Sequence, residues 1–586
     1  FFIQMGLTVV IAILISLVVS LTLTPMLCSR FMRLEERHGR IYTALEQGFR
    51  AVERAYRSAL AFALRRRALV VGSALLLFIL SLGLSRFIGR EFFTPADESR
   101  FIVRFETPLG WSIERIDAVA RQAEEILFSH PEVRGAFVGT GFFGSVNQGI
   151  MFVSLVPKSQ REVSQQQLMD TLRKELSAIP DLTVAVESVS PIGGGQRNTD
   201  IQYILEGPSL EDLAARSQLL EQRLKRSPGF VDVDTDLELT KPEAKVYINR
   251  EKAEDLGLDI ATITQAINIL MGGVDVAKFK EGGERYDIHL RALPGDRDLP
   301  SDLDRITVVS RDGRRVKLSN VIEVVESAGP NVINRYNRQR AVTLYANLQG
   351  KPQGEALAEV GRLIAETFPN APGYRAELAG RSREFQRSFQ YLGTALALSI
   401  LIIYMVLASQ FESFVHPFTI MLSLPLATVG VFGLLLLTGK TLNIFSYLGI
   451  IMLVGIVTKN AILLVDFTNQ LRARGLERTA AILQAGPIRL RPILMTAITT
   501  IAGMVPVSLA LSEGGETRAP LAVTVIGGML TSTFLTLLVI PVVYTLFDDL
   551  GQWLRRHLLR REERAPEVVL EQAPLLHQQT MSESGD

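Results

Sequence analysis

A lysine lies near the middle of one of the most apolar segments of this 586-residue chain. Lys459 is three residues from the midpoint between Lys440 and Arg472, the two charges that bracket the segment. An ionised lysine at the centre of a bilayer costs at least ~2.5–3.5 kcal/mol, so a buried one is expected to pair with an acid. Asp466 is too far away for a direct bond, about 10 Å along a helix that rises 1.5 Å per residue. Since no other apolar segment carries an acid to neutralise it, we expect the partner in another subunit or in a part of the protein outside this chain.

Two interpretations of Lys459 remain open at this point. A lysine near a helix end can extend its side chain to the membrane interface, which would need no partner. The central position of Lys459, with the polar residues Thr458 and Asn460 beside it, favours a functional role instead.

The next helix is expected to open at Arg489, where a second polar group lies. Arg489 and Thr496 are seven residues apart, so a helix places them on one face, and Pro492 suits a first helical turn. Alternatively, Arg489 and Arg491 are ordinary positive-inside anchors, and the Thr496 hydroxyl bonds to its own backbone.

The composition excludes several classes of protein. The chain is 47% hydrophobic and 21% charged, with 62 Lys and Arg against 61 Asp and Glu. It is too apolar for a soluble chain of this length and too neutral for a nucleic-acid binder. The single cysteine, Cys28, excludes an internal disulfide, and the six histidines are scattered singly. With no metal motif and no nucleophile–base arrangement, we expect neither an enzyme nor a metal cofactor.

Seven apolar stretches are long enough to cross a bilayer. They cover residues 5–28, 68–88, 390–409, 415–438, 443–468, 493–511 and 521–546. The segments 29–67 and 470–491 and the tail after 550 are rich in arginine, so the positive-inside rule places them in the cytoplasm and residues 90–388 on the outer side. The apolar stripe beside the arginines of 29–67 predicts a helix in the inner interface, with a soluble connector as the alternative. Because the chain opens with Phe inside an apolar stretch, we expect it to be part of a longer protein.

The outer region alternates strands and helices. Strands near 101–105, 133–139, 150–156 and 182–188 with helices near 113–127 and 162–178 predict a split β-α-β unit of ferredoxin-like outline. A second unit is expected from strands at 201–205 and 341–348 and helices after 209 and at 353–368. Residues 249–327 between its halves predict an inserted module with a helix at 260–271 and a hairpin turning at Gly282-Gly283. The fold class is therefore an α-helical membrane bundle plus α/β units with an inserted α+β module.

Aromatic residues gather around a glycine-flanked loop of the first unit. Gly141, Phe142, Phe143 and Gly144 form the loop, and Phe137 and Phe152 lie on the flanking strands. They could line an apolar binding surface or simply pack at the strand ends.

Four segments together resemble the resistance-nodulation-division efflux permeases, of the AcrB-like branch. They are Gly455-Ile-Val-Thr-Lys459-Asn460-Ala-Ile-Leu-Leu-Val-Asp466-Phe467, Arg489-Leu-Arg-Pro-Ile-Leu-Met-Thr496, Leu23-Thr24-Pro25-Met-Leu-Cys28 and Gly149-Ile-Met-Phe152-Val-Ser-Leu155. The resemblance extends to about residue 560, and members are about twice this length, so the chain corresponds to their C-terminal half with the last helix of the first half.

The resemblance implies a proton-driven exporter of drugs or other amphiphiles in the inner membrane of a Gram-negative bacterium. It implies a homotrimer that works with a periplasmic adaptor and an outer-membrane channel, powered by the proton-motive force without a cofactor. An aspartate pair in the missing half would pair with Lys459, and Asn460, Arg489 and Thr496 would serve the proton relay. The substrate pocket would include Phe137, Gly141, Phe142, Phe143, Gly144 and Phe152, although the loop is a few residues shorter here than in the family.

The same resemblance divides the chain into nine parts. They are a transmembrane helix at 1–28, the cytoplasmic or interfacial helix at 29–67, a transmembrane helix at 68–89, a periplasmic porter subdomain at 90–195, the first part of a second at 196–248, a docking module at 249–327, the remainder of the second at 328–388, five transmembrane helices at 389–548 and a partly disordered cytoplasmic tail at 549–586.

Two rival functions remain. A heavy-metal exporter of the same family would need methionine or carboxylate clusters, whereas Met151, Met169 and Met271 are isolated in the sequence. A non-transporting scaffold or translocation subunit would have no reason to retain a costly central lysine.

Overall fold

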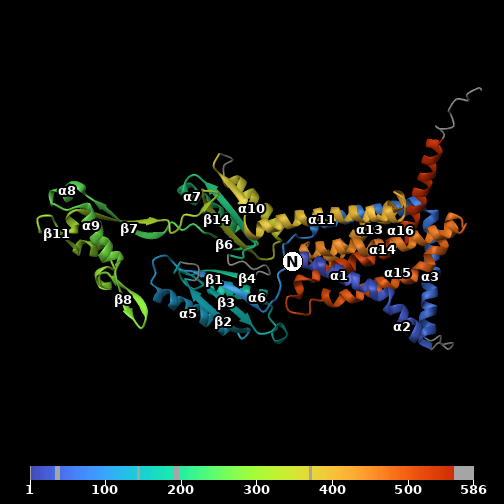
Figure 1. Ribbon diagram of the computed structural model, residues 1–586, viewed down its shortest axis with the longest axis horizontal. Helices are drawn as coiled ribbons and strands as arrows, with labels where there is room; N and C mark the ends of the chain where they lie inside the picture. The colour runs from blue at the N-terminus through green and yellow to red at the C-terminus, as the bar shows by residue number, and fades with distance from the viewer. Residues whose placement is uncertain (1, 33–39, 142–144, 190–196, 369–371, 560–586) are drawn as a thin grey trace, which may run out of the picture.

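A bundle of long helices at one end of the molecule carries two α/β units and, beyond them, a smaller inserted module (Figure 1). The computed structural model describes residues 2–32, 40–141, 145–189, 197–368 and 372–559. Within these residues seven helical segments are long and apolar enough to cross a membrane, which agrees with the number predicted from the sequence. They span 6–31, 67–87, 380–410, 415–437, 444–473, 478–508 and 515–553.

Within the described residues the bundle comprises ten helices. They are α1 (Phe2–Leu21), α2 (Leu23–Phe31), α3 (Arg40–Arg65), α4 (Arg67–Leu84), α11 (Gly380–Gln410), α12 (Val415–Met421), α13 (Ser423–Leu437), α14 (Ile444–Ala473), α15 (Arg478–Ser508) and α16 (Ala519–Leu559). Helix α3 runs across the end of the bundle rather than along it (Figure 1), with Tyr56, Leu60, Ala63 and Leu64 buried. The predicted helix in 29–67 is therefore present, and one face of it packs on α15 and α16.

Helix α15 corrects one expectation from the sequence. Arg489 does not open this helix, and Pro492 is not in its first turn, because α15 starts at Arg478 and contains Pro487, Pro492 and Pro506 in its interior. A proline inside a helix leaves the carbonyl four residues earlier without its usual donor. Tertiary packing outweighs that loss here. The turns just before Pro487 are packed into the bundle, with Ala481, Ile482, Ala485 and Gly486 buried.

The three arginine-rich regions meet at one end of the bundle. Arg478 at the start of α15 forms ion pairs with Asp548 (2.9 Å) and Asp549 (2.6 Å) of α16. Arg67 of α4 also pairs with Asp549 (2.8 Å), and Arg472 of α14 pairs with Asp548 (3.3 Å). Their common position is consistent with the single membrane side that the positive-inside rule assigns to them.

The backbones of α13 and α16 touch where two glycines meet. A Cβ added to Gly430 would lie 1.9 Å from the carbonyl oxygen of Gly527, and one added to Gly527 would lie 2.3 Å from that of Gly430. Only glycine permits this approach, as at other crossings of small residues in membrane bundles.

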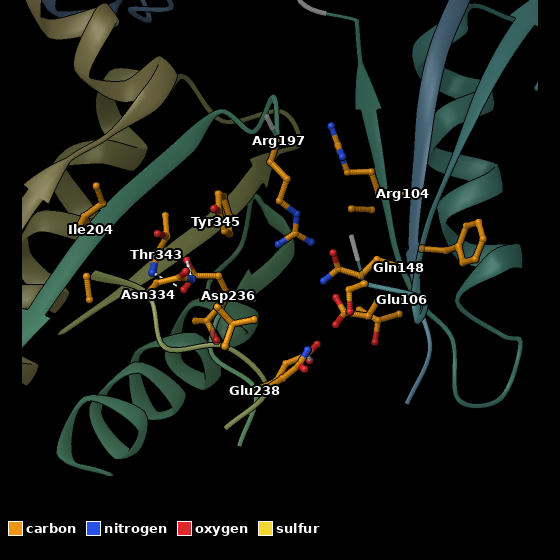
Figure 2. Close-up of a pocket in the computed structure, with 18 of the residues that line it drawn as sticks. Arg104, Glu106, Gln148, Arg197, Ile204, Asp236, Glu238, Asn334, Thr343 and Tyr345 are labelled. Atoms are coloured by element: carbon orange, nitrogen blue, oxygen red, sulfur yellow. Dashed lines mark hydrogen bonds between the residues drawn. The ribbon is translucent and has the colours of Figure 1, made fainter. Parts of the chain in front are cut away.

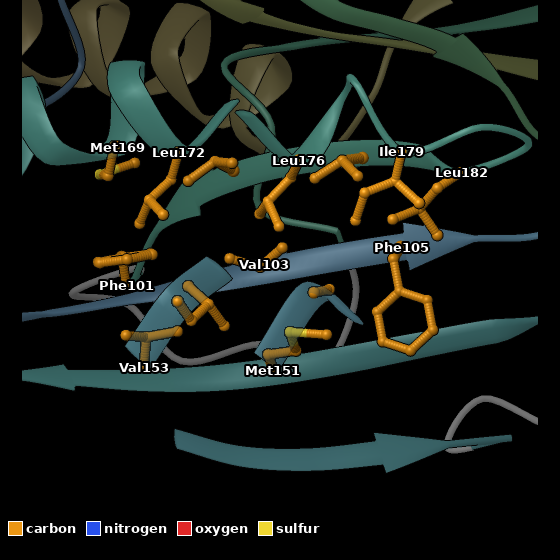
Figure 3. Packing of buried hydrophobic residues seen from close by; sticks show 14 of the residues in the cluster. Phe101, Val103, Phe105, Met151, Val153, Met169, Leu172, Leu176, Ile179 and Leu182 are labelled. Carbon is orange, nitrogen blue, oxygen red and sulfur yellow. The ribbon is translucent and has the colours of Figure 1, made fainter. Parts of the chain in front are cut away.

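The first α/β unit is an antiparallel sheet covered on one face by two helices. Its elements are β1 (Arg100–Glu106), α5 (Ile113–Ser129), β2 (Val133–Thr140), β3 (Gln148–Leu155), α6 (Gln165–Leu176) and β4 (Thr183–Ser188), with strand order β2-β3-β1-β4. Ser112 caps α5, and a Ser164–Gln167 capping box starts α6. Alternate residues of the strands, such as Val103 and Met151, pack against the apolar side of α6 (Figure 3).

The second unit combines strands that are far apart in sequence. It contains β5 (Ile201–Gly207), α7 (Leu210–Arg226), β6 (Phe230–Thr235), β13 (Arg335–Tyr336), β14 (Gln339–Leu348), α10 (Gln353–Thr367) and β15 (Arg375–Leu378). The sheet order is β13-β14-β5-β15, and β6 also pairs with β14.

The inserted module is reached through a two-stranded ribbon. Strands β7 (Lys241–Ile248) and β12 (Ile322–Gly329) pair antiparallel from Ile248 with Ile322 to Lys241 with Gly329. Beyond the ribbon lie α8 (Arg250–Asp255), α9 (Ile260–Ile267), β8 (Val274–Glu281), β9 (Glu284–Leu290), β10 (Thr307–Val309) and β11 (Arg315–Lys317). The predicted turn between β8 and β9 is present, with positive φ at both Gly282 and Gly283, as a tight hairpin requires.

Candidate functional site

Lys459 lies on a face of α14 that the other described residues do not cover. It is exposed, as is Gly455 one turn earlier, whereas Val457, Thr458 and Ala461 are buried in the bundle. Among the described residues Lys459 has no hydrogen-bond or ion-pair partner. Asp466 bonds instead to Gln470 (2.8 Å), in agreement with the expectation that it is too far away to pair with Lys459.

Asn460, the next residue, points into the bundle. It is only 2% exposed, and neither its amide oxygen nor its amide nitrogen has a hydrogen-bond partner in the described part of the chain. Burying an unbonded amide costs about 1–3 kcal/mol. Asn460 is therefore a second costly polar group, next to Lys459, in a segment that is otherwise apolar.

Arg489 connects α15 to the polar C-terminal part of α14. Its guanidinium lies 4.4 Å from the centre of the Phe467 ring, and its Nε is buried without a partner among the described residues. A cation over an aromatic face is stabilised by about 0.5–2 kcal/mol. This contact places Arg489 on the α14-facing side of α15.

The antiparallel geometry then fixes the level of Thr496. Arg489 lies level with Phe467, and seven residues span about 10 Å on each helix, so Thr496 lies roughly level with Asn460. Arg489 and Thr496 both lie in α15, two turns apart, and their shared face remains a prediction from that spacing. The Thr496 hydroxyl donates to the Ile493 carbonyl (3.0 Å), which is the backbone bond that the sequence left open as an alternative.

A polar cavity of about 560 Å³ separates the two α/β units. Figure 2 shows Arg104, Glu106 and Gln148 on one wall and Asp236, Thr343 and Tyr345 on the other. The cavity can therefore form hydrogen bonds and ion pairs with groups of either charge.

Ionic pairs and buried acids organise the walls of this cavity. Arg197 pairs with Asp234 (2.6 Å) and stacks over Tyr345 at 4.7 Å, and Arg104 pairs with Glu187 (3.2 Å). Burial raises the pKa of the Glu187 carboxyl in spite of its arginine neighbours.

Asp236 is the carboxylate of this cavity with the best-defined bonds. It accepts hydrogen bonds from the Thr343 N–H (2.6 Å) and from Asn334 Nδ2 (3.0 Å). Burial raises its pKa even so, because desolvation of the carboxylate outweighs these bonds.

The aromatic residues singled out in the sequence form a separate surface. Phe137 and Phe152 are directly opposite each other on β2 and β3, with ring centres 6.2 Å apart, and they are 61% and 40% exposed. They lie on the sheet face away from α5 and α6 and do not line the polar cavity. Gly141 follows β2, whereas Phe142, Phe143 and Gly144 lie outside the described residues.

The structure offers no cluster of metal ligands in the ranges it describes. No group of three or more His, Cys, Asp or Glu side chains that could hold a metal ion occurs there. Met151 and Met169 are core residues of the first unit, at most 2% exposed, so their thioethers are not available to a ligand.

The cavity residues were not found from the sequence. Arg104 and Asp236 are ordinary charged residues of strand and loop, and their approach depends on how two separately folded units dock. The run of acids 232, 234 and 236 at alternate positions of β6 and just beyond it was the one available signal, because alternation places such residues on one face.

Comparison with known proteins adds two findings. The family model described as the AcrB/AcrD/AcrF family matches residues 1–548. Two crystal forms of a heavy metal efflux pump superpose with a TM-score of 0.77 at 25% sequence identity, covering 86% of this chain and 53% and 52% of the pump. The chain therefore spans about half the length of these pumps.

Proposed function

This chain belongs to the AcrB/AcrD/AcrF family of resistance-nodulation-division efflux permeases, and from that premise we propose that it is part of a proton-driven exporter of amphiphilic compounds. The observation that carries the proposal is that Lys459, on an open face of a membrane-length helix, has no partner among the described residues and lies beside the amide of Asn460, which is also unbonded there. Members of this family are transporters rather than enzymes.

The open face of α14 accounts for the energetic cost of Lys459. We infer that an acid outside this chain covers that face and pairs with the lysine, because an ionised lysine in the membrane needs such a partner. Protonation of the acid would break the pair and change the packing of α14 against its neighbours. Each proton that falls through ~100 mV supplies about 2.3 kcal/mol, so the proton-motive force can drive the change without any other cofactor.

Arg489, Asn460 and Thr496 are placed to respond to that change. Thr496 is roughly level with Asn460, and Arg489 is about two turns nearer the basic end of the bundle. We assign these three residues to the proton relay together with Lys459.

The exposed pair Phe137 and Phe152 supports an amphiphilic substrate. Two aromatic rings on the outer face of a sheet offer apolar contact area, and we propose that this surface, with Gly141, Phe142, Phe143 and Gly144, contributes to the substrate pocket. The polar cavity between the units would then accommodate the polar part of the substrate.

A second candidate is the export of heavy metal ions, which the similar pumps favour by their description. The burial of Met151 and Met169 and the lack of a ligand cluster in the described ranges favour the amphiphile instead.

Location and assembly follow as part of the same proposal. We place the seven helices in a bacterial inner membrane, with the basic ends in the cytoplasm and the α/β units in the periplasm. The inserted module would dock a periplasmic adaptor and an outer-membrane channel, and the permease would be a homotrimer.

The test uses the full-length pump with Lys459→Ala or Lys459→Met. Export of an amphiphilic dye and the accompanying proton influx are measured in proteoliposomes, and both should be abolished while the protein remains folded. Lys440→Met removes a bracketing lysine at the end of a span and should leave export intact. Normal export by the Lys459 variants would exclude the proposed role, and transport of Zn²⁺ or Cu⁺ in place of the dye would favour the second candidate.

A further inference from the structure

The loop between α15 and α16, residues 509–518, is joined to the base of the first α/β unit by a dense set of bonds. Glu513 accepts from the Ser99 hydroxyl (3.1 Å) and from the backbone N–H of Lys158 (3.3 Å). Glu516 forms an ion pair with Lys158 and accepts from the backbone N–H of Asp97 (3.4 Å). The loop thus contacts both the segment that immediately precedes β1 and the turn that precedes α6.

The backbone of the loop takes part as well. The N–H of Gly514 donates to the Asp97 carbonyl (2.8 Å), and Gly514 has a φ of +67°, a conformation that favours glycine. The junction therefore fixes the loop by main-chain and side-chain bonds at once.

A buried ion pair anchors the other side of this junction. Arg161 and Asp97 pair with side chains that are only 2% and 9% exposed. Asp97 also accepts from the backbone N–H groups of Gln165 (3.0 Å) and Ser99 (3.2 Å). Burial opposes ionisation, but these bonds prevail and lower the pKa of the Asp97 carboxyl, so it is charged at neutral pH. A satisfied buried pair of this kind holds one geometry.

The second α/β unit is attached to different helices. Helix α11 begins inside that unit, where Ser382 accepts from the Gln202 N–H (2.9 Å) and Arg381 pairs with Asp200 (2.9 Å). The segment after α4, which continues into β1 of the first unit, bonds to Leu442 beside α14 through Gly89 and Glu91, and its Arg90 carbonyl accepts from the N–H of Gly354 in α10 of the second unit (2.9 Å). Loop 509–518 thus contacts the first unit, whereas α11 is continuous with the second unit.

The polar cavity lies between the two units, so a displacement of one against the other changes its shape. Helix α15 carries Arg489 and Thr496 and leads directly into the loop. We propose that loop 509–518 transmits movement of α15 and α16 to the first unit, with Glu513 and Glu516 as positioning residues that make it move against the second unit. This inference rests on the proposed function, since the movement it transmits is the one that proton transfer would cause.

The experiment reverses the charges of the Lys158–Glu516 ion pair, the more exposed part of the junction, in the full-length pump. Glu516→Lys places two lysines together and should lower the export rate about tenfold, within the range that coupling free energies produce. Lys158→Glu should do the same, and the combined Lys158→Glu/Glu516→Lys variant should recover part of the rate because the pair is restored in the opposite sense. Lys225→Glu/Glu221→Lys, a reversal of an exposed pair on α7, is the matched control and should export normally.

A distance measurement separates transmission from a merely structural role. Spin labels at the exposed positions Glu125→Cys on α5 and Gln218→Cys on α7, in a cysteine-free pump with Cys28→Ser, report the separation of the two units. In the parent this distance should change when a proton gradient is applied, and in Glu516→Lys it should not.

The outcomes distinguish this inference from the proposed function. A gradient-dependent distance that persists in Glu516→Lys, full export by that variant, or a combined variant no better than the single one would overturn the inference. A parent that neither exports nor responds to the gradient would instead overturn the proposed function.

Discussion

Replacing Gly430 with alanine should force α13 and α16 apart at their closest approach. The new methyl would lie 1.9 Å from the Gly527 carbonyl oxygen, whereas ordinary van der Waals contact begins at 3.4 Å, a shortfall of 1.5 Å (3.4 minus 1.9 Å). The obstacle is a backbone carbonyl, which cannot rotate away as a flexible side chain could. The Thr531 hydroxyl oxygen, 2.3 Å from the same position, would also have to move.

The magnitude follows from two opposing effects. Overpacking of a well-packed interior costs about 1–3 kcal/mol, and the rigid obstacle puts this site at the upper end. Alanine in place of glycine returns up to about 1 kcal/mol of helix propensity. We therefore expect Gly430→Ala to lower the free energy of unfolding by about 2 kcal/mol.

Gly433 provides a control on the same helix. A Cβ added there meets no atom within 4 Å, so Gly433→Ala should be neutral or stabilising by up to about 1 kcal/mol. The assay is unfolding of the purified full-length pump in one detergent, by heat and by increasing denaturant, followed by tryptophan fluorescence. If Gly430→Ala proved as stable as Gly433→Ala, the close approach of the two backbones would be refuted.

Two further outcomes are expected. Phe137→Ala and Phe152→Ala should each weaken export of apolar dyes, with a coupling of about 0.5–1.5 kcal/mol between them in a double-mutant cycle. The control Phe128→Ala, on the exposed side of α5, should have no effect on export. Additive effects of the first two substitutions would show that the two rings do not act together. Because burial raises the folded-state pKa of Asp236, its ionisation costs stability above that pKa, so Asp236→Asn should raise the unfolding temperature near neutral pH. This gain should vanish as the pH falls below the ordinary value of 3.8, where the carboxyl is protonated in both states, and a gain independent of pH would contradict the assignment.

The apolar pattern was sufficient to predict the membrane helices but not where each begins. Seven spans were expected and seven are observed in the described residues, because length and apolar character decide them. The start of α15 was missed by eleven residues, since Pro487 and the flanking arginines are typical of a loop, and packing against α3 and α14 keeps those turns helical. Likewise, α11 extends ten residues beyond the expected span because its first turns belong to the second α/β unit.

The residues of the candidate and proposed sites divide in the same way. Lys459 could be identified from sequence because its charge conflicts with its surroundings, a conflict visible without a structure. Glu516 and Asp97 could not, because each is an unremarkable acid in a loop and gains meaning only from contacts more than 400 residues away in the chain. The Gly430–Gly527 contact is equally hidden, since nothing in the sequence distinguishes Gly430 from Gly433 on the same helix, where an added Cβ meets no atom within 4 Å.

The ribbon of β7 and β12 makes the inserted module separable in evolution from the rest of the molecule. Its two strands pair with each other alone, and most of their side chains are exposed. Val246, Ile248, Ile322 and Val324, at the end next to the module, pack on the module's core, whereas the end next to the second α/β unit is free to lengthen. Adding two residues to each strand would preserve the alternation of faces and move the module outward by about 7 Å. A lineage could in this way adjust the reach of the module to partners of different height while the α/β units and the bundle stay unchanged.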